Sequence, residues 1–199
     1  MAARERLITS AIALIRRVGV TGASVSALLE QAGLARRTLY VNFPGGKPEL
    51  VEAAVDAASA ELTAAIQSCV EAADPAQTLA AFTRMWEAML AESDYTAGCP
   101  IVAATLGRSE VPAAADAAAA AFSTWEEMLS RLLRDAGLAR SAAVDLATTA
   151  VAAVEGAVIM SVAQRSPDPL RRTNRVLSRL IRSQTKSDPP STLTVAPVT

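Results

Sequence analysis

A group of side chains between residues 24 and 47 carries the hydrogen-bonding groups that proteins use on nucleic acids. Arg36, Arg37 and Thr38 stand in a row; a guanidinium fits the two acceptors of guanine in the major groove, and a hydroxyl can reach base edges. The hydroxyl, amide and ammonium groups around them suit phosphate oxygens, which fix register without reading sequence. The residues with this chemistry are Ser24, Arg36, Arg37, Thr38, Tyr40, Asn42 and Lys47. We predict that Arg36, Arg37 and Thr38 contact bases and that the others contact phosphates. The alternative is a helical bundle whose arginines are merely solvated.

The chain lacks the side chains that most enzymes and metal sites need. It has no histidine, and its two cysteines, Cys69 and Cys99, are far apart in sequence. No glycine-rich loop follows a strand, and no pair of carboxylates marks an acid–base site. We therefore expect no enzyme, no metal site and no cofactor. Two cysteines provide no disulfide framework, which fits the reducing cytoplasm.

Two short helices must position the nucleic-acid donors. Ser24 is a good N-cap for the first helix, and Gly33 suits the left-handed residue that ends it. The second helix runs from about Ala35 to Phe43, and the Pro-Gly-Gly run at 44–46 stops it. Two helices joined by a tight turn predict a helix-turn-helix motif, in which the N-terminal end of the second helix enters the major groove.

The same stretch resembles a known family. The run A-G-x-x-x-x-x-L-Y-x-x-F, from Ala32 to Phe43, is similar to the signature of TetR/AcrR-type bacterial repressors. The run F-P-G-G-K, which ends at Lys47, resembles the LmrA-type branch of that family. The resemblance covers about residues 4–60, because members share a DNA-binding head while their ligand domains diverge.

Three positions depart from the family pattern. Ala35 and Arg37 stand where the family usually has Ser and Gly, and Asn42 stands where it usually has His. Ala35 is a poor N-cap, which costs about 0.5–2 kcal/mol of local helix stability relative to Ser. Asn42 can still hydrogen-bond to a phosphate or a base edge, but it cannot titrate.

The resemblance implies both an architecture and a mode of action. It implies a homodimer, because two helix-turn-helix heads are needed to read the two half-sites of an inverted-repeat double-stranded DNA operator. It also implies a repressor that a small apolar effector releases from DNA. An architectural or constitutive DNA-binding protein that needs no effector is the alternative.

Aromatic and methionine side chains recur at helical spacing after residue 80. Taken one by one, they are ordinary core residues. The resemblance implies that helices in these positions enclose an effector cavity, and a Trp and Met lining suits a flat apolar molecule. The candidate ligand-binding residues are Phe82, Met85, Trp86, Met89, Cys99, Phe122, Trp125 and Met128. Glu155, in an apolar stretch, could pair with a cationic ligand, cap an interface or face water.

Charge divides the chain into parts. Residues 1–48 hold seven Lys and Arg against two acids, residues 49–166 hold six against sixteen, and residues 167–199 hold six against two, which gives the net charge of −1. A basic head on an acidic body can dock one end on phosphates. We expect a DNA-binding domain at 1–48, with the linking helix reaching about 60, a ligand-binding and dimerisation domain at 49–184, and a disordered tail at 185–199.

Apolar periodicity predicts an all-α fold of about nine helices, with an N-terminal three-helix head and a C-terminal helical bundle. The first helix spans about Arg4 to Val18, and a long linking helix runs from Lys47 to about Ala72. The stretch from 142 to 163 comes nearest to a membrane span, but it contains Asp145 and Glu155. We therefore expect no membrane segment.

Overall fold

Helices account for all regular structure in the part of the chain that is described. The computed structural model describes residues 2–70 and 74–185, in which there are nine helices and no strand. The helices are α1 (Ala3–Gly22), α2 (Val25–Ala32), α3 (Arg36–Asn42), α4 (Lys47–Val70), α5 (Pro75–Glu92), α6 (Pro100–Leu106), α7 (Pro112–Asp135), α8 (Arg140–Gln164) and α9 (Asp168–Thr185). The predicted all-α fold is confirmed.

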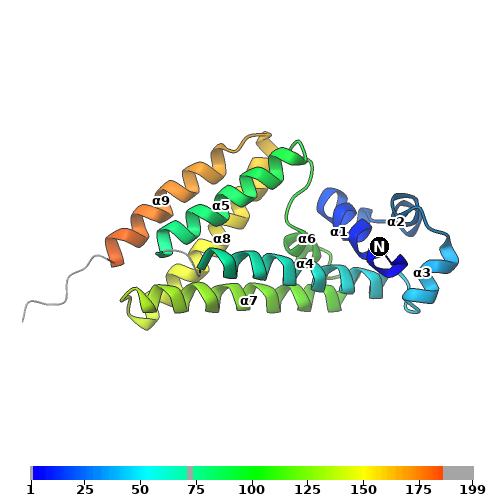
Figure 1. Ribbon diagram of the computed structural model, residues 1–199, viewed down its shortest axis with the longest axis horizontal. Helices are drawn as coiled ribbons and strands as arrows, with labels where there is room; N and C mark the ends of the chain where they lie inside the picture. Colours follow the sequence, from blue (N-terminus) through cyan, green and yellow to red (C-terminus); the bar gives the residue numbers. More distant parts are fainter. Residues whose placement is uncertain (1, 71–73, 186–199) are drawn as a thin grey trace, which may run out of the picture.

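Helices α1, α2 and α3 form a small bundle, here called the head, at one end of the molecule (Figure 1). Leu7 and Ile15 of α1 are buried in one cluster with Leu28 of α2 and Leu39 of α3. Removing these side chains from water is the main force that holds the three helices together.

The first helix continues past its predicted end at Val18. It runs to Gly22, but Gly19 has φ 72° and ψ 177°, which is not helical. Glycine adopts positive φ without a steric cost, so the break falls at the residue where the turn is predicted. The chain after this break carries Val20 into a buried position.

The helix ends of the motif follow their predicted caps. The Oγ of Ser24 accepts a 3.2 Å hydrogen bond from the backbone N–H of Ala27 at the start of α2. Gly33 ends α2 with φ 61°. Ala35 precedes α3 and has no side-chain oxygen to cap it. The predicted boundaries of both helices are therefore confirmed, and α3 begins without a side-chain cap.

Helix α4 belongs to both ends of the molecule. It is 24 residues long and packs on α1 of the head and on α7; Figure 1 shows it running from the head along α7. The predicted linking helix is confirmed. Its predicted end near Ala72 lies outside the described residues.

Helices α5 to α9 pack with α4 into the larger unit, here called the body. Helix α7 contacts α4, α6 and α8, and α9 contacts α5 and α8. By length and composition α8 could cross a membrane, with a mean hydropathy of 1.8, but 44% of that window is buried inside the fold. Because α8 supplies buried side chains to the core, we interpret it as a core helix.

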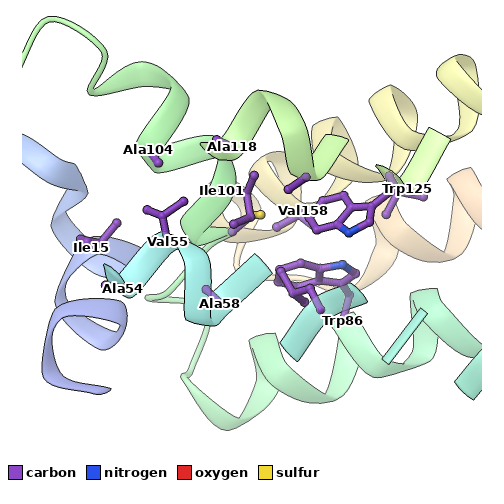
Figure 2. Close-up of a cluster of buried hydrophobic side chains, with 14 of the residues drawn as sticks. Ile15, Ala54, Val55, Ala58, Trp86, Ile101, Ala104, Ala118, Trp125 and Val158 are labelled. Atoms are coloured by element: carbon purple, nitrogen blue, oxygen red, sulfur yellow. The ribbon is translucent and has the colours of Figure 1, made fainter. Parts of the chain in front are cut away.

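The apolar core continues from the head into the body without a break. Figure 2 shows Ile15 of α1 with Ala54 and Val55 of α4 at one end of a buried cluster, and the indoles of Trp86 and Trp125 at the other. None of the five is more than 3% exposed. Head and body are thus packed against each other through α4.

The last described helix corrects the start of the predicted tail. Helix α9 ends at Thr185, the residue with which the predicted tail begins. The Oγ1 of Thr185 donates a 3.1 Å hydrogen bond to the carbonyl of Ile181, so Thr185 is helical. The rest of the predicted tail, 186–199, lies outside the described residues.

Candidate nucleic-acid interface and ligand pocket

The start of α3 presents two arginines to solvent. Arg36 and Arg37 are exposed, and Thr38 is half-buried. On the opposite face Leu39 and Phe43 are both 0% exposed. Because the core fixes that face, the helix holds the two guanidinium groups outward in a defined orientation.

The other predicted contacts of the motif differ in their exposure and in their partners. Tyr40 is 43% exposed, and the Arg36 guanidinium lies 5.9 Å from the centre of its ring. Asn42 is half-buried, and its Nδ2 donates a 2.8 Å hydrogen bond to the carbonyl of Thr38, which leaves the second N–H for another acceptor. Ser24 is exposed; since its oxygen accepts the capping bond of α2, its hydroxyl hydrogen is the group left to donate to a phosphate.

Two arginines on α1 brace the motif, a role that the sequence interpretation missed. Arg6 donates from Nη2 to the carbonyl of Ala32 at 2.6 Å, one of the carbonyls left without a partner at the end of α2. The guanidinium of Arg4 lies 5.0 Å from the centre of the Phe43 ring, within the range of a cation–π contact. Both side chains thus connect α1 to the helix-turn-helix.

Lys47, predicted to contact a phosphate, has a carboxylate partner in this structure. Its Nζ lies 2.5 Å from Oε1 of Glu110, in the connection between α6 and α7. The hydrogen bond from Lys47 holds the pKa of Glu110 below its usual range. Lys47 is at the N-terminus of α4, where a phosphate is also favoured, so Glu110 and a phosphate are alternative partners for one ammonium group.

Two further contacts join the head to the body. Arg16 donates from Nε to the carbonyl of Gly98 at 2.9 Å, and the Gly98 N–H donates to the carbonyl of Arg16 at 2.8 Å; burial lowers the pKa of Arg16. A Cβ on Gly107 would lie 2.6 Å from the Cβ of Val20, so only glycine allows this approach. We call the three pairs Arg16–Gly98, Val20–Gly107 and Lys47–Glu110 the head–body junction.

The body contains an apolar pocket among α4, α5, α7 and α8. Its cavity volume is about 50 Å³, which is below the range of small-molecule sites, so a ligand must widen it by separating the helices. The residues that line it are Ile66, Val70, Thr78, Leu79, Phe82, Trp125, Leu129, Ala150, Val151, Val154 and Glu155. Glu155 is the one charged side chain in this lining.

Two of the predicted ligand-binding residues line this pocket, and two more support it. Phe82 and Trp125 belong to the lining. Phe122 packs edge-on against Trp125 with ring centres 5.4 Å apart, and Trp86 packs edge-on against Phe82 at 6.4 Å. The indole N–H of Trp125 donates to Oγ1 of Thr63 at 2.9 Å, which fixes the orientation of the ring.

The remaining predicted ligand-binding residues lie elsewhere. Met85 and Met89 line a second hollow, among α1, α4, α5 and α6, that also includes Arg16. Cys99 is buried just before α6. Met128 is half-buried on α7 and is absent from the linings of both hollows.

Glu155 lies in the wall of the pocket, which decides among the positions that the sequence left open. It is 7% exposed, and within the described part of the chain its Oε2 has no hydrogen-bond partner. Burial raises its pKa to about 7, against a smaller lowering by a hydrogen bond from the Cys99 thiol. Burial, and then the charge of Glu155, raise the pKa of Cys99 well above its usual value, so that thiol is a donor rather than a nucleophile.

Comparison with known proteins agrees with this architecture over most of the chain. Residues 7–54 match the family described as bacterial regulatory proteins, tetR family, and residues 75–176 match the LmrA/YxaF-like C-terminal domain of transcriptional regulators. An uncharacterised HTH-type transcriptional regulator of Mycobacterium tuberculosis is 31% identical over 89% of this chain and 93% of its own length. The HTH-type transcriptional regulator LmrA of Bacillus subtilis is 26% identical, over 90% of this chain and 96% of its own length.

Solved structures share the fold. The regulatory protein TetR from Rhodobacter sphaeroides superposes with a TM-score of 0.82 at 22% identity, covering 89% of this chain and 97% of that one. A TetR regulator from Legionella pneumophila gives a TM-score of 0.81 at 17% identity, covering 90% and 97%. With a head that carries exposed arginines on a helix-turn-helix and a body that matches the LmrA/YxaF-like domain, this chain belongs to the TetR family of bacterial transcriptional regulators.

Proposed function

We propose that this regulator is a repressor that leaves an inverted-repeat operator when a small apolar molecule enters the pocket beside Trp125. The observation that carries the proposal is the course of α4. This helix begins at Lys47, next to the motif, and supplies Ile66 and Val70 to the pocket. A molecule that separates α4 from α7 would therefore move the helix on which the head is mounted.

Within the head, the exposed arginines are assigned to bases and the surrounding donors to phosphates. Arg36, Arg37 and Thr38 stand at the end of α3 that enters a major groove in helix-turn-helix proteins. Tyr40, Asn42, Lys47 and Ser24 are the remaining predicted contacts. The protein would work in the cytoplasm, where double-stranded DNA is its partner.

A homodimer is supported by apolar side chains left exposed on α8 and α9. Ile159 is 53% exposed and Met160 52% on α8, and Val176 is 62% exposed on α9. A Cβ on Gly156, which precedes Ile159 by three residues on α8, would have no atom within 4 Å, so a second helix can approach closely here. Light scattering at micromolar concentration should give twice the chain mass of 20.6 kDa. Ile159→Asp should lower this mass, whereas Leu106→Asp, at an 81% exposed site on α6, should not.

Release from DNA requires the effector to prefer the conformation that cannot bind DNA. Moving the population from mostly bound to mostly free takes about 5.5 kcal/mol of differential affinity between the two conformations. The head–body junction is where the two conformations would differ. Two of its residues, Glu110 and Gly107, lie in the connection between α6 and α7. A shift of this connection would act on Lys47 and Val20 together.

The test is one titration followed by two signals. Apolar aromatic compounds are added to the full-length dimer on labelled operator DNA, while tryptophan emission and DNA release are recorded. Because Trp125 lines the pocket and Trp86 lies behind Phe82, Trp86→Phe should keep the quenching and Trp125→Phe should lose most of it. Both signals should change over the same concentration range.

Two outcomes would overturn parts of the proposal. If release persists unchanged when Trp125 and Phe82 are both replaced by Ala in a folded dimer, the effector binds elsewhere. If no compound of a broad apolar panel releases DNA, the protein is the constitutive or architectural DNA-binding protein considered as the alternative.

A further inference from the structure

The wall of the pocket beside Trp125 contains a carboxyl group, with which a purely apolar molecule could make no hydrogen bond. Glu155 lies in its wall among aliphatic and aromatic side chains, and none of the other ten lining residues is charged. One carboxylate oxygen, Oε2, is buried and has no hydrogen-bond partner in the described residues. Buried polar atoms are normally hydrogen-bonded, so an unpartnered one at a pocket wall needs an explanation.

The surroundings of Glu155 provide a donor on one side only. The Cys99 thiol, just before α6, donates a hydrogen bond to the carboxyl group. The side chains that α4, α5 and α7 add to the pocket do not titrate and include one hydroxyl, that of Thr78. The charge of Arg16 of α1 acts on Cys99. Arg16 donates from Nε to the Gly98 carbonyl, and neither its buried Nη2 nor Oε2 of Glu155 has a hydrogen-bond partner in the described residues, so the two groups are not paired. Within residues 2–70 and 74–185, no cation therefore contacts Oε2.

We propose that the effector is a lipophilic amine, whose ammonium group donates a hydrogen bond to Oε2 of Glu155 while its apolar body lies against Trp125, Phe82 and Leu79. This proposal rests on the proposed function, since it assigns the chemical class of the effector of that same pocket. A charged donor to a carboxylate makes a stronger hydrogen bond than a neutral one.

The alternatives fit the wall less well. An anionic molecule would meet Glu155 and no cation. A purely apolar molecule would leave Oε2 without a partner, and it would remove any water that reaches the site through the mouth. Folding has already taken the carboxyl group out of bulk water, so the costs that an amine adds are its own dehydration and, below pH 7, the release of the carboxyl proton. In return it gains an ionic partner in a medium of low polarity.

Binding of an ammonium group to Glu155 should release a proton, whereas binding of an alcohol should not. At pH 6 Glu155, with a pKa of about 7, is mostly protonated in the free protein. The ammonium group favours the carboxylate form, so the carboxyl proton passes to the buffer and the ammonium group keeps its own. Close to one proton should therefore be released for each amine bound at pH 6.

The experiment compares matched ligands on the full-length dimer. Arylalkyl amines, beginning with naphthylmethylamine, are each paired with the alcohol of the same skeleton, such as naphthylmethanol, and affinities are measured from Trp125 emission. The amine should bind about tenfold more tightly than the alcohol, or more. Glu155→Gln, which keeps the side-chain volume, should abolish this preference, whereas Asp145→Asn, an equal change in charge at an exposed site on the same helix, should keep it.

A second measurement needs no variant. Calorimetric titration of the wild-type dimer at pH 6, in two buffers with different ionisation enthalpies, gives the number of protons released. A value near one for the amines and near zero for the alcohols supports the proposal even if Glu155→Gln fails to fold.

The contrary results separate this proposal from the proposed function. Equal affinity for amine and alcohol, with no proton release, overturns the amine assignment; if the alcohols still release operator DNA, the repressor with an apolar effector stands. If the dimer binds operator DNA but no member of either series binds to the pocket or releases DNA, both the amine assignment and the effector pocket are wrong.

Discussion

The head and the body use charge in opposite ways. In the head, Arg36 and Arg37 stand exposed on α3, where water solvates them until an anion replaces it. In the body, Glu155 is 7% exposed and has been taken out of water by the fold itself. The exposed pair keeps a fixed charge, whereas the buried acid has a pKa of about 7. A surface charge thus attracts a partner from a distance, and a buried one selects a partner that has already entered.

The strongest test of this contrast is the pH dependence of stability at Glu155. Its folded pKa of about 7 lies above the reference value of 4.5, so the folded state favours the protonated acid. Below pH 4.5 Glu155 is mostly protonated in both the folded and the unfolded chain, so it does not lower the stability of the fold. As the pH rises from 4.5 to 7 the unfolded chain releases the proton first, and the fold loses up to about 3 kcal/mol, which remains lost at higher pH.

Urea unfolding at fixed dimer concentration measures this effect. The stability of Glu155→Gln relative to wild type should rise between pH 5 and pH 8, by no more than that amount. The exposed Asp145→Asn variant should show no such rise. Parallel curves for wild type and Glu155→Gln would mean that Glu155 is solvated.

The next largest effect is expected in the head. Arg37→Ala should weaken binding to the preferred operator by about 1–3 kcal/mol and relax the choice of one base, because a guanidinium on guanine discriminates by this amount. Binding of operator and random DNA is compared by fluorescence anisotropy, with the exposed Arg17→Ala as the control of equal charge. Equal losses on both DNAs would show that Arg37 contacts a phosphate.

A smaller effect tests the uncapped start of α3. Ala35→Ser should raise the stability of the head by about 1 kcal/mol, because a serine oxygen can accept from the first free N–H groups of the helix. Ser24→Ala, which removes the 3.2 Å cap of α2, should lower it by a similar amount. Hydrogen exchange of the amides of α2 and α3 measures both changes locally. Unchanged exchange in Ala35→Ser would indicate that packing alone fixes α3.

The smallest effect concerns Lys47, which is a predicted DNA contact and also pairs with Glu110 of the body. Lys47→Ala should weaken binding to all DNA sequences and flatten the logarithmic salt dependence by about one unit, as the loss of one phosphate contact does. Glu110→Gln should strengthen DNA binding slightly, because it removes the competing carboxylate. Affinities at several salt concentrations test both variants. If Glu110→Gln has no effect, the Lys47–Glu110 pair does not compete with DNA.

The head could be predicted closely because its signals are local. Ser24, Gly33 and Gly46 act on their immediate neighbours, and caps of this kind depend on few residues. The contacts that the sequence interpretation missed join residues far apart in the chain. Arg6 reaches the carbonyl of Ala32, Arg16 reaches Gly98, and Lys47 reaches Glu110, at separations of 26, 82 and 63 residues. No periodicity encodes such pairs.

The pocket was harder to predict for the same reason. Trp86 and Trp125 have equal side chains at helical spacing, yet Trp125 lines the pocket and Trp86 packs behind it. Met85 and Met89 face a different hollow. Glu155 could be singled out as a charge in an apolar stretch, but its position in the pocket depends on how α8 packs against α5 and α7. Residue type indicates what can line a pocket, and tertiary packing decides which residues do.

The head–body junction has a consequence for how freely such regulators can be recombined. Arg16 is half-buried and its Nε has its partner in the Gly98 carbonyl, and Val20 fits only because residue 107 has no side chain. In a chimera that joins this head to another body, the residues that face Arg16 and Val20 would differ from Gly98 and Gly107. Nε of Arg16 could then lose its partner, which is costly for a buried donor. Exchange of operator specificity between relatives is therefore best made by grafting the exposed face of α3, with the junction residues of the recipient left in place.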